Sequence, residues 1–351
     1  MKVIQIDKKD WNRGIDQSRK AYQIFGPVTD GNQSVFKHLA HDQYPDMEQP
    51  DTIMSPKSVL FPQSEKILGT SLDPAVENHH IMERPETDYS PRAVIGIRPY
   101  DARALTLVNL NFDTPEYRDP YWCDAYAATT FVGLAINRPS KADFSIAMGS
   151  GPFAEKGLDA LLVDTGNLYL AKMLTPKGEA YFAEAGFDTI ADTDKSLEKI
   201  EGLKAAAEAA MGPFNVFTDK LAEKTILDLH SAPFWDDLAF TCINCGTCTF
   251  VCPTCWCFDI QDETKGKSAA RFRNWDTCMS PLFTMHGSGH NPRGEKTQRV
   301  RQRFMHKLKY FVDKYEQGTM CVGCGRCVEK CPVNIDIRLI CNQMNSYEPQ
   351  K

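Results

Sequence analysis

Short apolar runs alternate with polar stretches over the first two thirds of the chain. Residues 93–97, 130–136 and 160–164 are apolar runs with the length of buried strands, and residues 144–148 have a similar pattern. Residues 32–89 are polar and rich in proline, which predicts long loops. This alternation predicts a mixed α/β region.

Helical patterns follow this region. Residues 192–211 are rich in Ala, Glu, Lys and Leu, which predicts a helix. Residues 218–230 predict a second helix, with Thr218 as its N-cap and Pro233 as its end. Further along, residues 296–316 have a helical pattern within the long segment between Cys257 and Cys321. We therefore expect a largely helical C-terminal part.

Two copies of one cysteine pattern lie in this C-terminal part. Each copy is a C-x-x-C-x-x-C-x-x-x-C-P run, a spacing typical of proteins that hold two cubane iron–sulfur clusters. In such proteins the fourth cysteine of each run binds the other cluster. The spacing therefore predicts two 4Fe-4S clusters, one bound by Cys242, Cys245, Cys248 and Cys331, and the other by Cys321, Cys324, Cys327 and Cys252.

Zinc ribbons and disulfides are the alternatives for these cysteines. Zinc sites use paired C-x-x-C arms with four ligands each, which does not account for two longer runs that both end in Cys-Pro. Thirteen cysteines in a chain without a recognisable secretion signal indicate metal ligands rather than disulfides.

The uneven distribution of cysteine predicts two domains, because only Cys123 precedes residue 242. We expect a mixed α/β scaffold or docking domain at residues 1–232 and an α-helical ferredoxin domain with both clusters at residues 233–351. The predicted fold class is α+β.

Four cysteines of the second domain lie outside the two runs: Cys255, Cys257, Cys278 and Cys341. Buried packing is the simpler interpretation, since free cysteine is often interior. The alternative is a third metal site or a substrate site near Cys255, Cys257 and Cys278, which would make the chain a stand-alone iron–sulfur reductase.

Other motifs give little support for catalysis. Gly149-Ser-Gly151 and Ala154 fit a dinucleotide fingerprint, but too few residues follow for a crossover helix, so we expect a glycine-rich turn. No Walker loop is present. We assign no catalytic residue and no organic cofactor site, and whether the chain is itself an enzyme stays open.

Residues 296–309 form a strongly basic segment. Arg299, Arg301 and Arg303 cannot all lie on one helical face, so we expect some to point toward the clusters and some toward a partner. Nucleic-acid binding is not expected, because aromatic residues are not interleaved with the basic ones.

Charge and hydropathy narrow the functional class. The net charge is −6, so there is no overall attraction to nucleic acid. No apolar run approaches the roughly 18 residues that a membrane span needs. Because the N-terminus has no apolar signal region and oxygen-sensitive clusters suit a reducing compartment, we expect a cytoplasmic protein.

The C-terminal motifs resemble one family of iron–sulfur subunits. Residues 242–260, 273–278, 289–293, 299–307 and 321–327 carry the resemblance, together with residues 96–105 and 148–152 upstream. The family comprises the beta subunits of cytoplasmic nickel–iron (sulf)hydrogenases, the corresponding iron–sulfur subunit of anaerobic sulfite reductase, and the flavin oxidoreductase modules that accompany heterodisulfide reductase.

The chain departs from this family in its N-terminal part. The family has cysteines where this sequence has Tyr100, Asn137 and residues 142–145, and those cysteines are expected to hold an additional cluster. We therefore expect that the additional cluster has been lost and that the domain is kept as a scaffold.

The resemblance implies an electron-transfer subunit of an anaerobic oxidoreductase complex. Its expected partners are a flavin/NAD(P)-binding reductase subunit and a catalytic redox subunit of the hydrogenase, sulfite reductase or heterodisulfide reductase type. This implies a hetero-oligomer. The alternatives are the stand-alone reductase and a purely structural role for the clusters.

Overall fold

The computed structural model describes residues 2–31, 33–48, 52–212 and 214–349. A seven-stranded sheet forms the centre of the N-terminal part, in the order β1 (Val3–Asp7), β8 (Leu168–Met173), β7 (Ala160–Asp164), β6 (Thr129–Leu134), β5 (Arg92–Ile97), β2 (Gln23–Asp30) and β3 (Gln33–His38). The four strands β2, β5, β6 and β7 are parallel to their neighbours in this group, while β1, β8 and β3 pair antiparallel at the edges. The three strands predicted at residues 93–97, 130–136 and 160–164 are thus confirmed.

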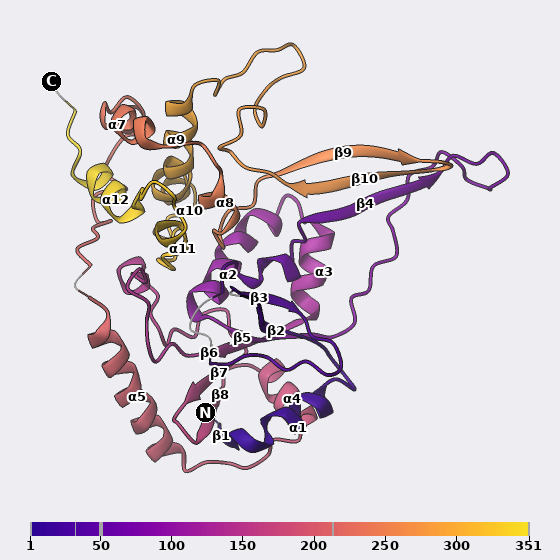
Figure 1. Ribbon diagram of the computed structural model, residues 1–351, viewed down its shortest axis with the longest axis vertical. Coiled ribbons are helices and arrows are strands. Elements are labelled where there is room, and N and C mark those ends of the chain that lie inside the picture. The colour runs from indigo at the N-terminus through magenta and orange to yellow at the C-terminus, as the bar shows by residue number, and fades with distance from the viewer. Residues whose placement is uncertain (1, 32, 49–51, 213, 350–351) are drawn as a thin grey trace.

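Helices cover both faces of this sheet, which explains why its inner strands are apolar throughout. Helices α2 (Pro99–Phe112) and α3 (Pro120–Ala128) pack on the face that carries Val94 and Phe131. Helices α1 (Trp11–Ser18) and α4 (Pro176–Glu184) pack on the face that carries Ile95 and Val132. Figure 1 shows these two layers, with helix α5 (Thr193–Ala210) along one side.

The C-terminal part forms a helical body. It contains α6 (Ile226–His230), α7 (Phe234–Thr241), α8 (Thr247–Phe250), α9 (Lys296–Met305), a π-helical turn (His306–Tyr310), α10 (Phe311–Tyr315), α11 (Arg326–Glu329) and α12 (Ile337–Ser346). Its core includes Trp235 of α7, Met305 of α9 and Met344 of α12, and it also includes Phe144 and Met148 of the N-terminal part. The α+β class is confirmed.

Several details of the predicted elements are wrong. Residues 144–148 form a 3-10 helix (Ser145–Met148) instead of a strand. The helix predicted at residues 218–230 begins only at Ile226, because the Thr225 hydroxyl accepts the Asp228 backbone N–H at 3.1 Å and serves as its N-cap. The predicted end of this helix at residue 230 is confirmed, and Pro233 follows three residues later as the N-cap of α7. The helix expected at residues 192–211 is confirmed as α5, with Asp192 as its N-cap.

The segment between the cysteine runs is also less helical than expected. Strands β9 (Phe258–Lys265) and β10 (Ser268–Trp275) form a hairpin whose two-residue turn uses Gly266 at φ +60°. Strand β4 (Ser64–Ser71), in a region predicted as loops, pairs with β10 to complete a three-stranded sheet. Asn32 and residues 49–51 of that predicted loop region lie outside the described residues. The domain division between residues 232 and 233 stays a prediction. The pairing of β4 with β10 joins segments from the two sides of this predicted boundary.

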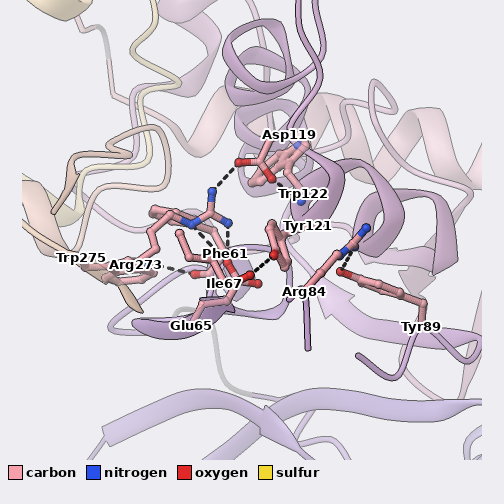
Figure 2. Close-up of polar contacts among 10 residues, drawn as sticks. All are labelled: Phe61, Glu65, Ile67, Arg84, Tyr89, Asp119, Tyr121, Trp122, Arg273 and Trp275. Atoms are coloured by element: carbon pink, nitrogen blue, oxygen red, sulfur yellow. Dashed lines mark hydrogen bonds and ion pairs between the residues drawn. The ribbon is translucent and has the colours of Figure 1, made fainter. Parts of the chain in front are cut away.

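Arg273 of β10 fixes this contact between the two parts. Arg273 is 3% exposed, and its guanidinium forms ion pairs with Glu65 and Asp119 and lies 4.9 Å from the ring centroid of Phe61. Trp275 donates from Nε1 to the backbone oxygen of Phe61 at 3.0 Å. Figure 2 shows the Arg273 side chain between its two carboxylate partners. The pairing of β4 with β10 is therefore stabilised by a buried charge network.

Candidate iron–sulfur centres

The two cysteine runs adopt matching local structures. In each run a glycine with positive φ precedes a four-residue helix that carries the third cysteine: Gly246 (φ +75°) before α8 and Gly325 (φ +73°) before α11. A Cβ on Gly325 would lie 2.4 Å from the backbone oxygen of Ala142, so the second run packs tightly against the N-terminal part. Glycine is required there for both conformation and space.

The folded chain brings the eight predicted ligands together around two adjacent cavities. The first cavity is lined by Cys242, Cys245, Cys248, Cys327 and Cys331. The second is lined by Cys252, Cys321, Cys324 and Cys327. Each cavity is therefore lined by the first three cysteines of one run and the last cysteine of the other, and Cys327 also borders the first cavity. Because Cys327 and Arg303 line both cavities, the two sites are immediate neighbours.

The cysteine side chains of these cavities suit metal ligation. Burial raises the pKa of Cys327 to about 12 and raises the pKa of Cys242 and Cys321. Such thiols stay protonated at neutral pH unless a metal replaces the proton, and metal binding then releases protons. Backbone N–H groups point at two sulfur positions, since Asn244 donates to Cys242 Sγ at 3.3 Å and Ile335 to Cys331 Sγ at 3.2 Å. The residues present thus fit two thiolate-ligated clusters.

Basic side chains lie beside the same sulfurs. Arg303 is 2% exposed and donates from Nε to Cys248 Sγ at 2.9 Å and from Nη2 to the Cys248 carbonyl at 3.0 Å. Although burial alone would favour the neutral amine, the nearby Cys252 and Cys255 sulfurs raise the pKa of Lys307 above its ordinary value. Arg301, by contrast, points away and donates to the His230 carbonyl at 3.0 Å. The expected inward-pointing arginine is thus found as Arg303, while the contact of another arginine with a partner stays a prediction.

Replacing Arg303 with glutamine should lower the reduction potential of the cluster next to Cys248 by on the order of tens of millivolts. The reduced cluster carries one more negative charge, which the guanidinium stabilises through its hydrogen bond to Cys248 Sγ. Redox titration followed by electron paramagnetic resonance measures this shift. Arg301→Gln is the matched control, because Arg301 bonds to the His230 carbonyl and not to a cysteine sulfur. An equal shift in both variants would contradict the assignment.

Lys57 contacts the loop that carries Cys252 and Cys255, and this contact was not predicted from the sequence. It lies in the N-terminal part, is 3% exposed, and donates to the backbone oxygens of Cys255 (2.6 Å) and Cys252 (3.3 Å). Its ammonium lies 4.0 Å from the ring centroid of Trp275, and burial lowers the pKa of Lys57 to about 8. Nothing in its sequence neighbourhood signals this role, because the contact depends on a fold that joins residues almost 200 positions apart.

Two of the three places at which the resemblance leads us to expect further cysteines contact the second run. Tyr100 is buried, and the Arg326 guanidinium lies 5.4 Å from its ring centroid. Phe144, in the segment 142–145, donates its backbone N–H to the Gly323 carbonyl at 2.8 Å. Asn137 is elsewhere and donates from Nδ2 to the Asp164 carbonyl at 2.6 Å. The segments at Tyr100 and Phe144 therefore support the second cysteine run through packing and backbone contacts.

The three additional cysteines Cys255, Cys257 and Cys278 line a separate cavity of about 490 Å³. Cys341 does not line it; its Sγ lies 3.4 Å from the Phe217 backbone oxygen, as expected for a buried packing residue. No helix among the described residues has the length and apolarity that crossing a membrane requires.

Comparisons with known proteins agree with this geometry. Residues 241–335 match a family described as a 4Fe-4S dicluster domain. The chain is also 26% identical over 343 residues to the sulfhydrogenase 2 subunit beta of Pyrococcus furiosus, a similarity that covers 96% of each sequence. No solved structure matches the chain significantly. Residues 241–335 thus match a 4Fe-4S dicluster domain, which implies two 4Fe-4S clusters, and the chain as a whole is similar to the beta subunit of a sulfhydrogenase.

Proposed function

We propose that the chain relays single electrons between a flavin/NAD(P)-linked subunit and a catalytic redox subunit of a hetero-oligomeric complex. Each bound cluster would take up and release one electron. The observation that carries the proposal is the adjacency of the two cysteine-lined cavities, which share Cys327 and Arg303. Two redox centres that share a wall suit sequential transfer of single electrons through the chain.

The proposed ligands follow the crossed arrangement. Cys242, Cys245, Cys248 and Cys331 hold one cluster, while Cys321, Cys324, Cys327 and Cys252 hold the other. Support comes from the cavity linings, in which the last cysteine of each run reaches the cavity of the opposite run. Cys327 borders both cavities, and we assign it to the second because it continues the Cys321-x-x-Cys324 spacing.

The surface near the first cavity supports docking of a partner. Cys245 is exposed, and the neighbouring apolar side chains Phe240 (86% exposed) and Ile243 (61% exposed) also face solvent. Apolar side chains that stay exposed next to a redox site are typical of an interaction surface. We place the contact with one redox partner here, where the distance between the proposed cluster and the surface is short.

The catalytic partner is assigned by class. The relative from Pyrococcus furiosus is named as the beta subunit of a sulfhydrogenase, which supports a catalytic subunit of the hydrogenase type. Sulfite reductase and heterodisulfide reductase types are the other candidates that the motifs suggest. The proposed location is the cytoplasm, where reducing conditions preserve thiolate-ligated clusters.

The purified, cluster-loaded chain should not oxidise NADH or NADPH by itself. Hydride transfer delivers two electrons, and a flavin is needed to divide them into single steps. We expect photochemically reduced chain to pass electrons to an artificial one-electron acceptor, and NAD(P)H oxidation to begin only when a flavin subunit is added. NAD(P)H oxidation by the chain alone would instead favour the stand-alone reductase.

Iron analysis of the anaerobically purified chain should give roughly eight iron atoms per chain, as two 4Fe-4S clusters require. The Cys255→Ser, Cys257→Ser and Cys278→Ser variants should keep this value, because these cysteines line neither cluster cavity. A reproducible value near twelve that falls in these variants would show that they are metal ligands.

A further inference from the structure

The cavity lined by Cys255, Cys257 and Cys278 is much larger than the two cluster cavities. Its volume is about 490 Å³, whereas the cavities proposed to hold one cluster each measure about 30 and 20 Å³. This size lies within the roughly 300–1,000 Å³ range of small-molecule sites. Tyr117, which lines it, is 55% exposed, so the cavity reaches the protein surface. The cavity is therefore large enough to hold a small molecule.

The lining of this cavity is cationic. It includes Arg293, Arg303, Lys307 and Lys314, and none of the described residues that line it is Asp or Glu. Arg303 lines this cavity and both cluster cavities, and its buried Nη1 atom has no hydrogen-bond partner among the described residues. A buried guanidinium N–H without a partner is costly, and negative charge in an adjoining cavity would satisfy it.

The remaining walls are mostly aromatic. Trp256, Phe258, Tyr310, Phe311 and Tyr315 all line the cavity. Flat rings provide apolar contact area for another flat group, and the tyrosines add hydroxyl groups for orientation. Aromatic walls and positive charge without a balancing carboxylate suit a flat organic molecule that carries a negative charge.

The cavity also adjoins the second cluster cavity. Thr254, Arg303 and Lys307 line both spaces, and Lys307 Nζ donates to Thr254 Oγ1 at 2.6 Å. A molecule in the large cavity would therefore lie one layer of side chains from the cluster proposed on Cys252, Cys321, Cys324 and Cys327. An anion there would add negative charge beside Arg303 and Lys307, the two cations that line the second cluster cavity.

We propose that this cavity is a binding site for a flat organic anion next to the second cluster. The site would bind the anionic group with Arg293, Arg303, Lys307 and Lys314 and the ring with the aromatic walls. This inference goes beyond the proposed relay and does not depend on which partner subunits the chain has.

The test uses the anaerobic, cluster-loaded full chain and a pair of probes that share a ring system and differ in charge. Equilibrium dialysis with 2-naphthalenesulfonate should show one saturable site per chain. The affinity for 2-naphthol should be lower by a factor of about ten or more. The Arg293→Gln/Lys314→Gln double variant should weaken sulfonate binding by about tenfold or more, since both residues line the cavity and neither belongs to the lining of a cluster cavity. Arg301→Gln removes a charge from α9 at a position outside the cavity lining and should leave binding unchanged.

A second readout places the bound anion near the cluster. Saturating 2-naphthalenesulfonate should lower the reduction potential of the second cluster in the wild type and have a smaller effect in the double variant. Equal binding of the two probes, or equal loss of binding in Arg301→Gln and the double variant, would overturn the proposal. An iron content near twelve that depends on Cys255, Cys257 and Cys278 would also overturn it, because the cavity would then hold metal.

Discussion

Replacing Cys252 with serine should remove the cluster built on Cys321, Cys324 and Cys327 and leave the other cluster in place. The iron content should fall from roughly eight to roughly four atoms per chain. The reason is that Cys252 lines the second cavity, although it directly follows the first three cysteines in sequence. Electron paramagnetic resonance of the reduced protein would identify which of the two signals survives.

Cys255→Ser is the matched control for this experiment. Cys255 lies three residues further along the same loop and hydrogen-bonds the Cys252 side chain, but it lines neither of the two cluster cavities, so both clusters should remain. If Cys252→Ser instead removed the cluster on Cys242, Cys245 and Cys248, ligation within each run would replace the crossed arrangement.

Replacing Arg273 with glutamine should lower the free energy of unfolding by about 3–5 kcal/mol, the usual cost of breaking a buried ion pair. The substitution leaves Glu65 and Asp119 without their buried cation, and their side chains are only 15% and 21% exposed. Burial already raises the pKa of Glu65 above its ordinary value, even though Arg273 opposes this shift. Urea unfolding of the wild type and the variant measures the difference.

The pH dependence and a nearby control make this prediction specific. Without Arg273 the folded-state pKa of Glu65 rises further, so the deficit relative to the wild type should be largest at neutral pH and shrink as the carboxylate becomes protonated at lower pH. Arg271→Gln, two residues earlier in β10, breaks an exposed pair with Asp262 and should cost about 1 kcal/mol or less. Similar losses in both variants would contradict a special role for the buried network.

Much of the candidate site followed from the sequence because cluster ligation depends on local spacing. The C-x-x-C-x-x-C geometry is set within one short turn and helix, so the spacing of the two runs was enough to predict the cofactors and to group the ligands. The inner strands β5, β6 and β7 could also be predicted from the sequence, since strands buried on both faces are apolar throughout. The hairpin β9–β10 was missed because β9 is polar and largely exposed, and because the half-buried β10 pairs with β4, which lies about 200 residues away in the sequence.

The sequence by itself thus determined the cofactor class, the ligand spacing and the α+β class, because each of these depends on residues close together in the chain. The tertiary structure decided which basic side chain donates a hydrogen bond to a cysteine sulfur. Arg299, Arg301 and Arg303 have the same charge within one short segment, yet only the folded helix places Arg303 on Cys248 Sγ. It also decided the contact of Lys57 with the Cys252 and Cys255 carbonyls and the shared wall between the large cavity and the second cluster cavity. These arrangements depend on long-range packing, which the order of residues along the chain does not display.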